Sequence, residues 1–166
     1  MADPVVVGVD GSAESLDALE VAAGLAQQTG APLLVLHVRH EGSLAAAGEI
    51  AASVDVAIVE ALDEAAAAAR TQVFQRLAGT GLDWRFDTAE GDPADELVRH
   101  AVEHQAATIV VGGRAHGLIG GVILGSVAQK LVRASPISVL VVRDGAAQRF
   151  GRTTGDSTKG LTPASA

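Results

Sequence analysis

The feature that most constrains the fold of this chain is an alternation between short runs of β-branched residues and longer alanine-rich runs. Residues 5–9 and 33–38 are largely apolar, which is typical of strands buried on both faces of a sheet. Residues 12–28 place apolar side chains at helical spacing. Chains that alternate strand and helix fold as parallel sheets with helices on both faces. The sequence therefore predicts an α/β domain built on a single doubly wound parallel sheet.

The expected elements follow one another in strict alternation, and only residues 39–53 lack a clear pattern and predict a loop. After residue 143 the composition shifts to Gly, Thr, Ser and Arg with little apolar content, which is typical of disorder. We therefore expect one domain over residues 1–143 and a disordered tail over residues 144–166. The expected strands are 5–9, 33–38, 82–88, 108–111 and 137–142, and the expected helices are 12–28, 56–77, a helix within 91–104, and 127–133.

Capping residues mark where two of these helices begin. Ser12 is a suitable N-cap for the first helix, and Gly30 can end it. Asp92 is a suitable N-cap for the third, where Pro93 suits the first helical position. Ligands of doubly wound sheets bind beyond the carboxyl ends of the strands, at the point where the strand order reverses. We therefore expect a binding crevice at that edge of the sheet.

The charge and the aromatic content of the chain argue against nucleic-acid binding. The formal net charge is -8 with neutral histidine, and the Lys and Arg residues are scattered along the chain. An acidic surface repels phosphate backbones. Aromatic residues make up only 2% of the chain and Tyr is absent, so a base-stacking platform is not expected. The sequence predicts no nucleic-acid partner.

The chain has no cysteine, which excludes disulfides, thiolate metal sites and cysteine nucleophiles. Its first ten residues, MADPVVVGVD, lack the basic flank and long apolar core of a signal peptide. No apolar run reaches the roughly 18 residues that a membrane span needs. We expect a cytoplasmic protein with no membrane partner.

A glycine-rich stretch over residues 110–127, VVGGRAHGLIGGVILGSV, follows the fourth expected strand and precedes a helix that begins near Ser126. Bare backbone in such a loop lets N–H groups approach phosphate oxygens, and a helix N-terminus favours negative charge. The alternative is a tight turn with Ser126 as an ordinary N-cap. Neither GxGxxG nor the Walker pattern is present, so the pattern by itself leaves both interpretations open.

Asp10 directly follows the first expected strand, at its carboxyl edge, in VVVGVDGS. A carboxylate at that edge can accept hydrogen bonds from a ribose hydroxyl or an adenine amine. The alternative is an aspartate that only caps the first helix, and the residue types do not separate the two.

The segment from His100 to His104 reads HAVEH and matches the pattern H-x-x-E-H, in which two histidines can share a metal on one helix face. The pattern is short, and no third ligand stands near it. A GxSxG nucleophile elbow is absent, and no nucleophile with a base partner can be named. The sequence therefore predicts no metal site and no catalytic residue.

Three segments give the chain a resemblance to the universal stress proteins over residues 4–143: VVVGVDGSAES, VLHV, and GGRAHGLIGGVILGSVAQKLVRASPISVLVVR. Nucleotide-binding members carry G-x2-G-x9-G-[ST] in the third segment. Here the signature begins at Gly112 and ends at Gly125 and Ser126, with Ala115 in place of the second glycine. A methyl group there obstructs the turn if φ must be positive. The turn stays compatible with alanine if φ is negative, or if Gly113 and Gly117 supply it.

The resemblance implies a Rossmann-like fold of the adenine-nucleotide alpha hydrolase type, with strand order 3-2-1-4-5. It implies ATP between strands 1 and 4, with or without Mg²⁺, and with other adenine nucleotides as further ligands. Asp10 would face the ribose or adenine, Val38 would offer backbone to the base, and the glycine-rich loop would surround the phosphates. The expected site residues are Gly8, Val9, Asp10, Val38, Gly112, Gly113, Arg114, Ala115, His116, Gly117, Gly125, Ser126 and Val127.

The resemblance also implies a homodimer formed through the last strand, 137–142, whose ends are Ile137 and Val142. An apolar strand at the edge of a sheet is a hazard unless it is paired. Two alternatives to an ATP-binding stress-response protein remain open at this point. One is a dimeric interaction module of the same family that binds no nucleotide, and the other is a slow ATPase, for which no general base stands out.

Overall fold

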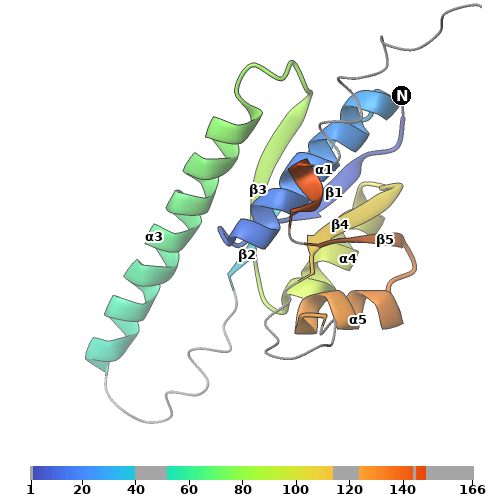
Figure 1. Cartoon of the computed structure of the whole chain (residues 1–166). Coiled ribbons are helices and arrows are strands. Elements are labelled where there is room, and N and C mark those ends of the chain that lie inside the picture. Colours follow the sequence, from blue (N-terminus) through green and yellow to red (C-terminus); the bar gives the residue numbers. More distant parts are fainter. Residues whose placement is uncertain (1, 40–51, 114–123, 144, 149–166) are drawn as a thin grey trace, which may run out of the picture.

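Parallel strands form a single five-stranded sheet in the order β3-β2-β1-β4-β5, which confirms the expected topology (Figure 1). The computed structural model describes residues 2–39, 52–113, 124–143 and 145–148. The strands are β1 (Val5–Gly8), β2 (Leu33–Arg39), β3 (Trp84–Glu90), β4 (Thr108–Gly112) and β5 (Ser138–Val142), and the helices are α1 (Ala13–Thr29), α3 (Ala52–Leu77), α4 (Pro93–Glu103) and α5 (Ser126–Ala134).

The predicted helix caps are confirmed. The Ser12 side chain accepts a hydrogen bond from the backbone N–H of Ser15, and Gly30 ends α1 in the left-handed conformation at φ 66°. The Asp92 carboxylate accepts hydrogen bonds from the N–H groups of Ala94 and Asp95 at the start of α4. Local sequence determines these ends because each cap involves residues only a few positions apart.

Two elements differ from the expected ranges. Helix α3 begins at Ala52, four residues before the expected start at 56. Strand β3 covers Trp84–Glu90, two residues later than the expected 82–88. The pairing with β2 explains the shift of β3, because the register runs from Leu33 opposite Trp84 to Arg39 opposite Glu90.

Part of the expected tail contacts the domain. The backbone N–H of Gly145 donates to the carboxylate of Asp17 in α1 at 2.8 Å, and Ala147 is buried. The rest of the expected tail, residue 144 and residues 149–166, lies outside the described residues.

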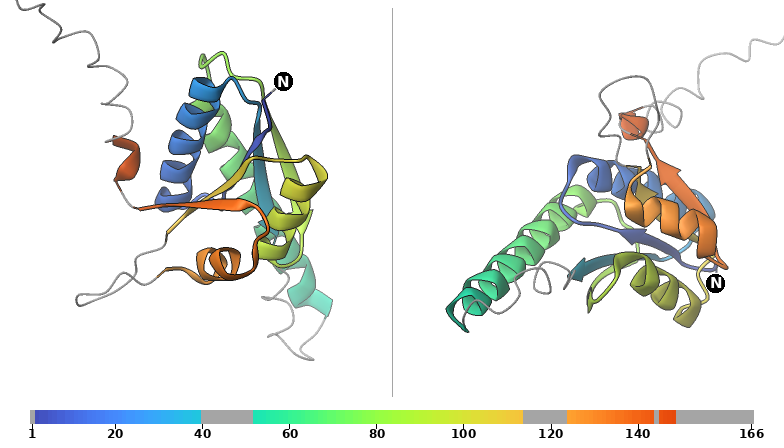
Figure 2. Two further views of the ribbon diagram at one scale, coloured as in Figure 1. Left: turned by 90° about the vertical axis from the view of Figure 1, so that its right-hand side faces the viewer. Right: turned by 90° about the horizontal axis from the view of Figure 1, so that it is seen from below.

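The sheet has a hydrophobic core on each face. Val5 and Val7 of β1 pack on the side of α1 and α3, whereas Val6 packs on the side of α4 and α5. Figure 2 shows α1 and α4 on opposite sides of the strands. All three valines are at most 2% exposed, so β1 is a central strand buried on both faces, as its continuous apolar run predicts.

The strand order reverses between β1 and β4, because β1 is the central strand of the sheet. From β1 the chain runs outward through β2 to β3, and it then returns to the other side of β1 to form β4 and β5. The carboxyl ends of β1 and β4 therefore face the crevice where ligands of such sheets bind. None of the helices in the described part of the chain combines the length and apolar character of a membrane span.

Candidate functional site

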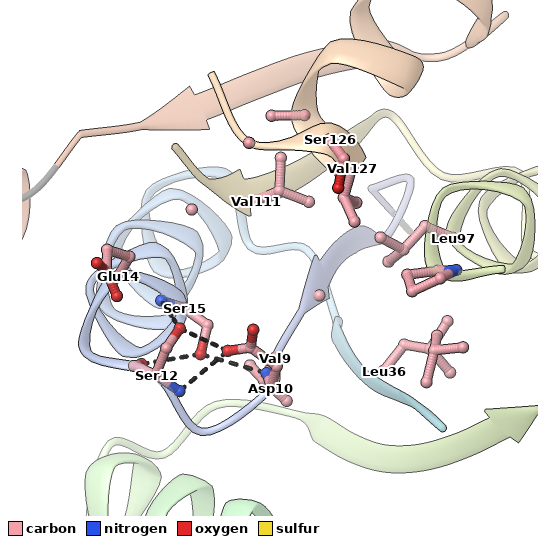
Figure 3. A pocket seen from close by; sticks show the side chains of 16 residues that line it. Val9, Asp10, Ser12, Glu14, Ser15, Leu36, Leu97, Val111, Ser126 and Val127 are labelled. Atoms are coloured by element: carbon pink, nitrogen blue, oxygen red, sulfur yellow. Dashed lines mark hydrogen bonds between the residues drawn. The ribbon is translucent and has the colours of Figure 1, made fainter. Parts of the chain in front are cut away.

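A pocket of about 250 Å³ lies at the carboxyl ends of β1 and β4 (Figure 3). The side chains of Asp10, Ser12 and Ser15 lie on one side of it, and Leu36 and Leu97 lie on the other. The pocket therefore offers a polar wall and an apolar wall, as binding sites for small molecules usually do.

The polar wall is the loop between β1 and α1, which an internal hydrogen-bond network holds in place. One carboxylate oxygen of Asp10 accepts hydrogen bonds from the backbone N–H of Ser12 at 2.9 Å and from its hydroxyl at 2.5 Å. The N–H of Asp10 donates to the hydroxyl of Ser15 at 3.3 Å, and that hydroxyl donates to the carbonyl of Ser12 at 2.9 Å. Gly11 turns the chain at φ 84°. Ser12 is thus the helix cap, and Asp10 orders the loop at the pocket edge.

His37 of β2 holds the backbone that follows β1 in place. Its side chain is only 6% exposed, and its Nδ1 lies 2.9 Å from the carbonyl oxygen of Val9. Because a carbonyl only accepts, Nδ1 carries the proton and donates. The N–H of Val9 in turn donates to the carbonyl of Leu36 at 2.9 Å. These bonds fix the backbone of Val9, which lines the pocket, although the sequence does not single out His37.

Helix α5 begins at the pocket with Gly125 as its N-cap residue. Among the residues that the structure describes, no side chain makes a capping hydrogen bond to this helix. The N-termini of α1 and α4 are capped by Ser12 and Asp92. The first N–H groups of a helix have no intrahelical acceptor and carry a partial positive charge. Since Ser126 and Val127 line the pocket, this uncapped end can bind an anion there.

An ion-pair network joins α4 to α5 beside the pocket. The ammonium group of Lys130 lies 2.8 Å from the carboxylate of Asp95 and 3.1 Å from that of Asp92. Desolvation by itself would raise the pKa of Asp92, but hydrogen bonds from the backbone of Asp95, from Lys130 and from the backbone of Ala94 lower that pKa below its usual value. Asp92 therefore stays ionised as both a helix cap and a partner of α5.

The charged side chains that line the pocket in the described part of the chain are both acidic. They are Asp10 and Glu14. The attraction of the described pocket for an anion therefore comes from the backbone at the start of α5 rather than from a lysine or arginine side chain.

The pocket gathers many of the residues that the sequence predicts for the site. Gly113 is not among those that line it, because its N–H donates to the carbonyl of Val142 at 2.7 Å and its α-carbon faces the side chain of Val141 in β5. The expected residues Arg114, Ala115, His116 and Gly117 lie outside the described residues. The expected residues that line the pocket are Gly8, Val9, Asp10, Val38, Gly112, Gly125, Ser126 and Val127.

Gly112 lines the pocket but has a second role in packing. A Cβ at this position would lie 2.7 Å from the backbone oxygen of Glu14 and 2.8 Å from its carbonyl carbon. Contacts this short do not occur, so the glycine is required for the close approach of α1 to β4. The sequence resemblance assigns this glycine to the phosphates alone.

Several residues that line the pocket are not predicted by the sequence. The helical spacing of Leu97 predicts only a core residue, and the sequence predicts Leu36 and Val111 only as residues of buried strands. Glu14 reads only as an acidic residue in the first turn of a helix. No local signal distinguishes them, because their place at the pocket depends on how α1 and α4 pack on the sheet. The remaining pocket residues outside the expected set are Ser12, Ser15, Pro93 and Ala128.

Comparison with known proteins agrees with this architecture. The universal stress protein YxiE of Bacillus subtilis (strain 168) is 30% identical over 156 residues, covering 86% of this chain and 100% of that protein. A solved universal stress protein in complex with cAMP is 29% identical, with a TM-score of 0.60, and covers 86% of this chain and 97% of its own.

A second solved structure is the universal stress protein from Archaeoglobus fulgidus in complex with dAMP. It is 26% identical, with a TM-score of 0.50, and covers 84% of this chain and 96% of its own. The model of the universal stress protein family matches residues 1–143, which include every strand and helix described above. This chain therefore belongs to the universal stress protein family.

Proposed function

We propose that this protein binds an adenine nucleotide, ATP first among them, in the pocket between β1 and β4 and acts as a cytoplasmic regulator in the stress response. The observation that carries the proposal is the N-terminus of α5 at Gly125, which no side chain of the described segments caps and which lines a pocket at the point where the strand order reverses. A phosphate group is the natural ligand of such a helix end.

Each part of a nucleotide has a suitable wall in this pocket. The apolar side chains of Leu36 and Leu97 can contact the adenine ring, and the backbone of Val38 can hydrogen-bond to its edge. The carboxylate of Asp10, held by Ser12, can accept from a ribose hydroxyl. The phosphates would then lie at Ser126, at the start of α5.

The related structures support an adenine nucleotide over other phosphate ligands. One related universal stress protein is solved in complex with cAMP and another in complex with dAMP. Both ligands share adenine, a sugar and a phosphate, which match the apolar wall, the polar wall and the start of α5 in this pocket.

The acidic lining favours a nucleotide that carries a divalent cation. A triphosphate would lie in the same pocket as the carboxylates of Asp10 and Glu14. Mg²⁺ coordinates phosphate and carboxylate oxygens and would offset this repulsion. We therefore include Mg²⁺ in the proposal for ATP, with AMP-like ligands able to bind without it.

The first test is to identify the ligand that copurifies with the protein. Mass spectrometry of gently purified, then denatured protein is expected to detect an adenine nucleotide. Calorimetry on the stripped protein is expected to show one nucleotide bound per chain, with Mg²⁺ strengthening the binding of ATP. An empty native protein that also shows no heat with millimolar ATP, ADP, AMP or cAMP contradicts the proposal and favours the interaction module without nucleotide.

We also propose that the protein is a homodimer that pairs through β5. Within the described residues β5 is an edge strand that pairs only with β4. Leu140 is 39% exposed on this strand, and Val132 of the adjacent α5 is 57% exposed. An exposed apolar edge invites pairing with a second copy, which would bury both side chains.

Replacing Leu140 with lysine is expected to convert the dimer to a monomer. A two-fold axis near β5 would bring both copies of the new charge together, and like-charge contacts in an interface cost roughly several kcal/mol. Sedimentation equilibrium measures the outcome. The matched control is Val102→Lys, which changes an apolar side chain of α4 that is 51% exposed and is expected to remain dimeric. A monomeric wild type, or a dimer that Leu140→Lys leaves intact, would rule out this interface.

A further inference from the structure

The last turn of α4 brings together three side chains that can bind a metal ion. His100 and His104 are one helical turn apart, with rings stacked at an interplanar angle of 10° and centroids 6.0 Å apart. Glu103 lies between them in sequence. One ligand atom from each of the three residues lies within 4.8 Å of the others. The sequence predicts no metal site because no third ligand is evident near the two histidines. In the structure the carboxylate of Glu103, the acidic residue within the same pattern, lies close enough to be that ligand.

The hydrogen bonds of His104 determine which of its nitrogens carries the proton. Nδ1 lies 2.9 Å from the carbonyl oxygen of His100, which can only accept, so Nδ1 is the donor. Nε2 contacts the guanidinium of Arg85 from β3, which can only donate. Nε2 therefore presents its lone pair. Metal-binding histidines are commonly oriented in this way, with the other ring nitrogen donating to a backbone carbonyl.

His100 also presents its Nε2 to an arginine. Its Nε2 lies 3.0 Å from the guanidinium of Arg99 and must accept, so its lone pair also lies on Nε2. His100 and His104 are half-buried and Glu103 is exposed. The two imidazoles thus present the same nitrogen, and their present partners are the ends of two exposed arginine side chains.

From this arrangement we propose that the last turn of α4 is a binding site for a divalent transition-metal ion of the zinc class, held by Nε2 of His100, Nε2 of His104 and the carboxylate of Glu103, with water as the remaining ligand. Imidazole and carboxylate are typical zinc ligands, whereas Mg²⁺ and Ca²⁺ prefer sites made of oxygen alone. Zn–N bonds of about 2.0–2.1 Å place two ligands of a tetrahedral ion roughly 3.4 Å apart. Small rotations of these accessible side chains close the difference.

The metal ion and the two arginines compete for the same lone pairs. When the ion binds, the guanidiniums of Arg85 and Arg99 must leave Nε2. Other carboxylates already hold them: Arg85 lies 2.9 Å from Asp87, and Arg99 lies 2.6 Å from Glu96. Their displacement leaves the pairs with Asp87 and Glu96 in place. Arg99 also lies 2.7 Å from Glu103, so metal binding breaks that ion pair together with one hydrogen bond to each imidazole.

The site is separate from the nucleotide pocket. Pro93 and Leu97 of α4 line that pocket, whereas the three proposed ligands follow them at the end of the helix, and none of the three lines the pocket. Metal binding here does not depend on nucleotide binding, and the two can be tested separately.

Titration calorimetry of the full, untagged chain with Zn²⁺ is the test. We expect one Zn²⁺ ion per chain at sub-millimolar concentration and no heat with Mg²⁺. His100→Gln and His104→Gln are each expected to weaken Zn²⁺ binding roughly tenfold or more. The matched control is His40→Gln, which removes a histidine from another part of the chain and is expected to leave the affinity unchanged. Loss of binding in His40→Gln alone, or no binding in the wild type, overturns the proposal.

The variant Arg85→Gln distinguishes a metal site from a surface network of arginine and histidine side chains. Arg85→Gln leaves all three ligands and removes a competing cation, so it is expected to tighten Zn²⁺ binding severalfold. Thermal unfolding in the absence of metal checks that each variant is folded. Weaker binding in Arg85→Gln would show that the guanidinium supports the metal site rather than competes with it, and would overturn the proposed geometry.

Discussion

Replacing Gly125 with aspartate is expected to weaken nucleotide binding about ten- to hundredfold and to leave the unliganded fold at least as stable as before. Gly125 has φ −61° and ψ 158°, an extended conformation that any residue adopts, so the new side chain introduces no backbone strain. Aspartate is a strong N-cap residue, and it would stabilise α5 by about a few tenths of a kcal/mol over glycine. The same carboxylate would occupy the N–H groups proposed to bind phosphate, and it would repel the phosphate itself.

Thermal unfolding with and without nucleotide measures this effect. A ligand at about 100 times its dissociation constant stabilises a protein by roughly 2.7 kcal/mol. Loss of one hydrogen bond to a charged group costs roughly 1.5–3 kcal/mol, or about a ten- to hundredfold loss of affinity. With a hundredfold loss, the stabilisation in Gly125→Asp falls to about 0.4 kcal/mol at the same nucleotide concentration.

Gly125→Asn is the matched variant, because asparagine caps the helix in the same way but carries no charge. We expect it to weaken nucleotide binding less than aspartate does, and the difference reports the charge repulsion alone. If Gly125→Asp keeps the full nucleotide-dependent stabilisation, the phosphates do not lie at the start of α5.

Gly112→Ala is expected to destabilise the fold itself. The added methyl group would lie 2.7 Å from a backbone oxygen of α1, at Glu14, and backbone cannot move aside as a side chain can. Helix α1 must then shift away from β4, and overpacking of this kind costs roughly 1–3 kcal/mol. Urea unfolding of the protein without nucleotide measures the loss.

Gly8→Ala is the matched control for this change. A methyl group at Gly8 would meet the ends of the Leu97 side chain at 3.0 and 3.2 Å, and this flexible side chain can move. We expect a smaller loss of stability than for Gly112→Ala. Equal midpoints for Gly112→Ala and the wild type would mean that α1 and β4 are not as close as the structure has them. A substitution of Gly112 cannot test nucleotide binding by itself, because it also disturbs the packing of α1 on β4.

Much of the fold could be predicted because its signals are local. The apolar run in β1 and the helical spacing in α1 indicate each element from neighbouring residues, and the caps at Ser12 and Asp92 reach only a few positions along the chain. The extent of β3 could not be predicted in this way. Its limits follow from its pairing with β2, a strand formed by a distant part of the sequence.

Some residues of the candidate site could be predicted from the sequence and others could not, for the same reason. The glycine-rich stretch and Asp10 stand at strand ends, so a site at this edge of the sheet could be predicted. Glu14 and Leu97 could not, because they reach the pocket only when α1 and α4 pack on the sheet. The sequence likewise could not predict that the α-carbon of Gly113 faces Val141, because that contact depends on the neighbouring strand β5.

The sequence by itself determined the order of strands and helices along the chain, the starts of α1 and α4, and the resemblance that names the family. Only the tertiary structure decided that Gly112 serves the contact between α1 and β4, and that Arg85 from β3 meets His104 at the end of α4. The physical reason is distance along the chain. Caps and hydrophobic periodicity involve residues within a few positions, whereas these contacts join segments that only the packing of helices on the sheet brings together.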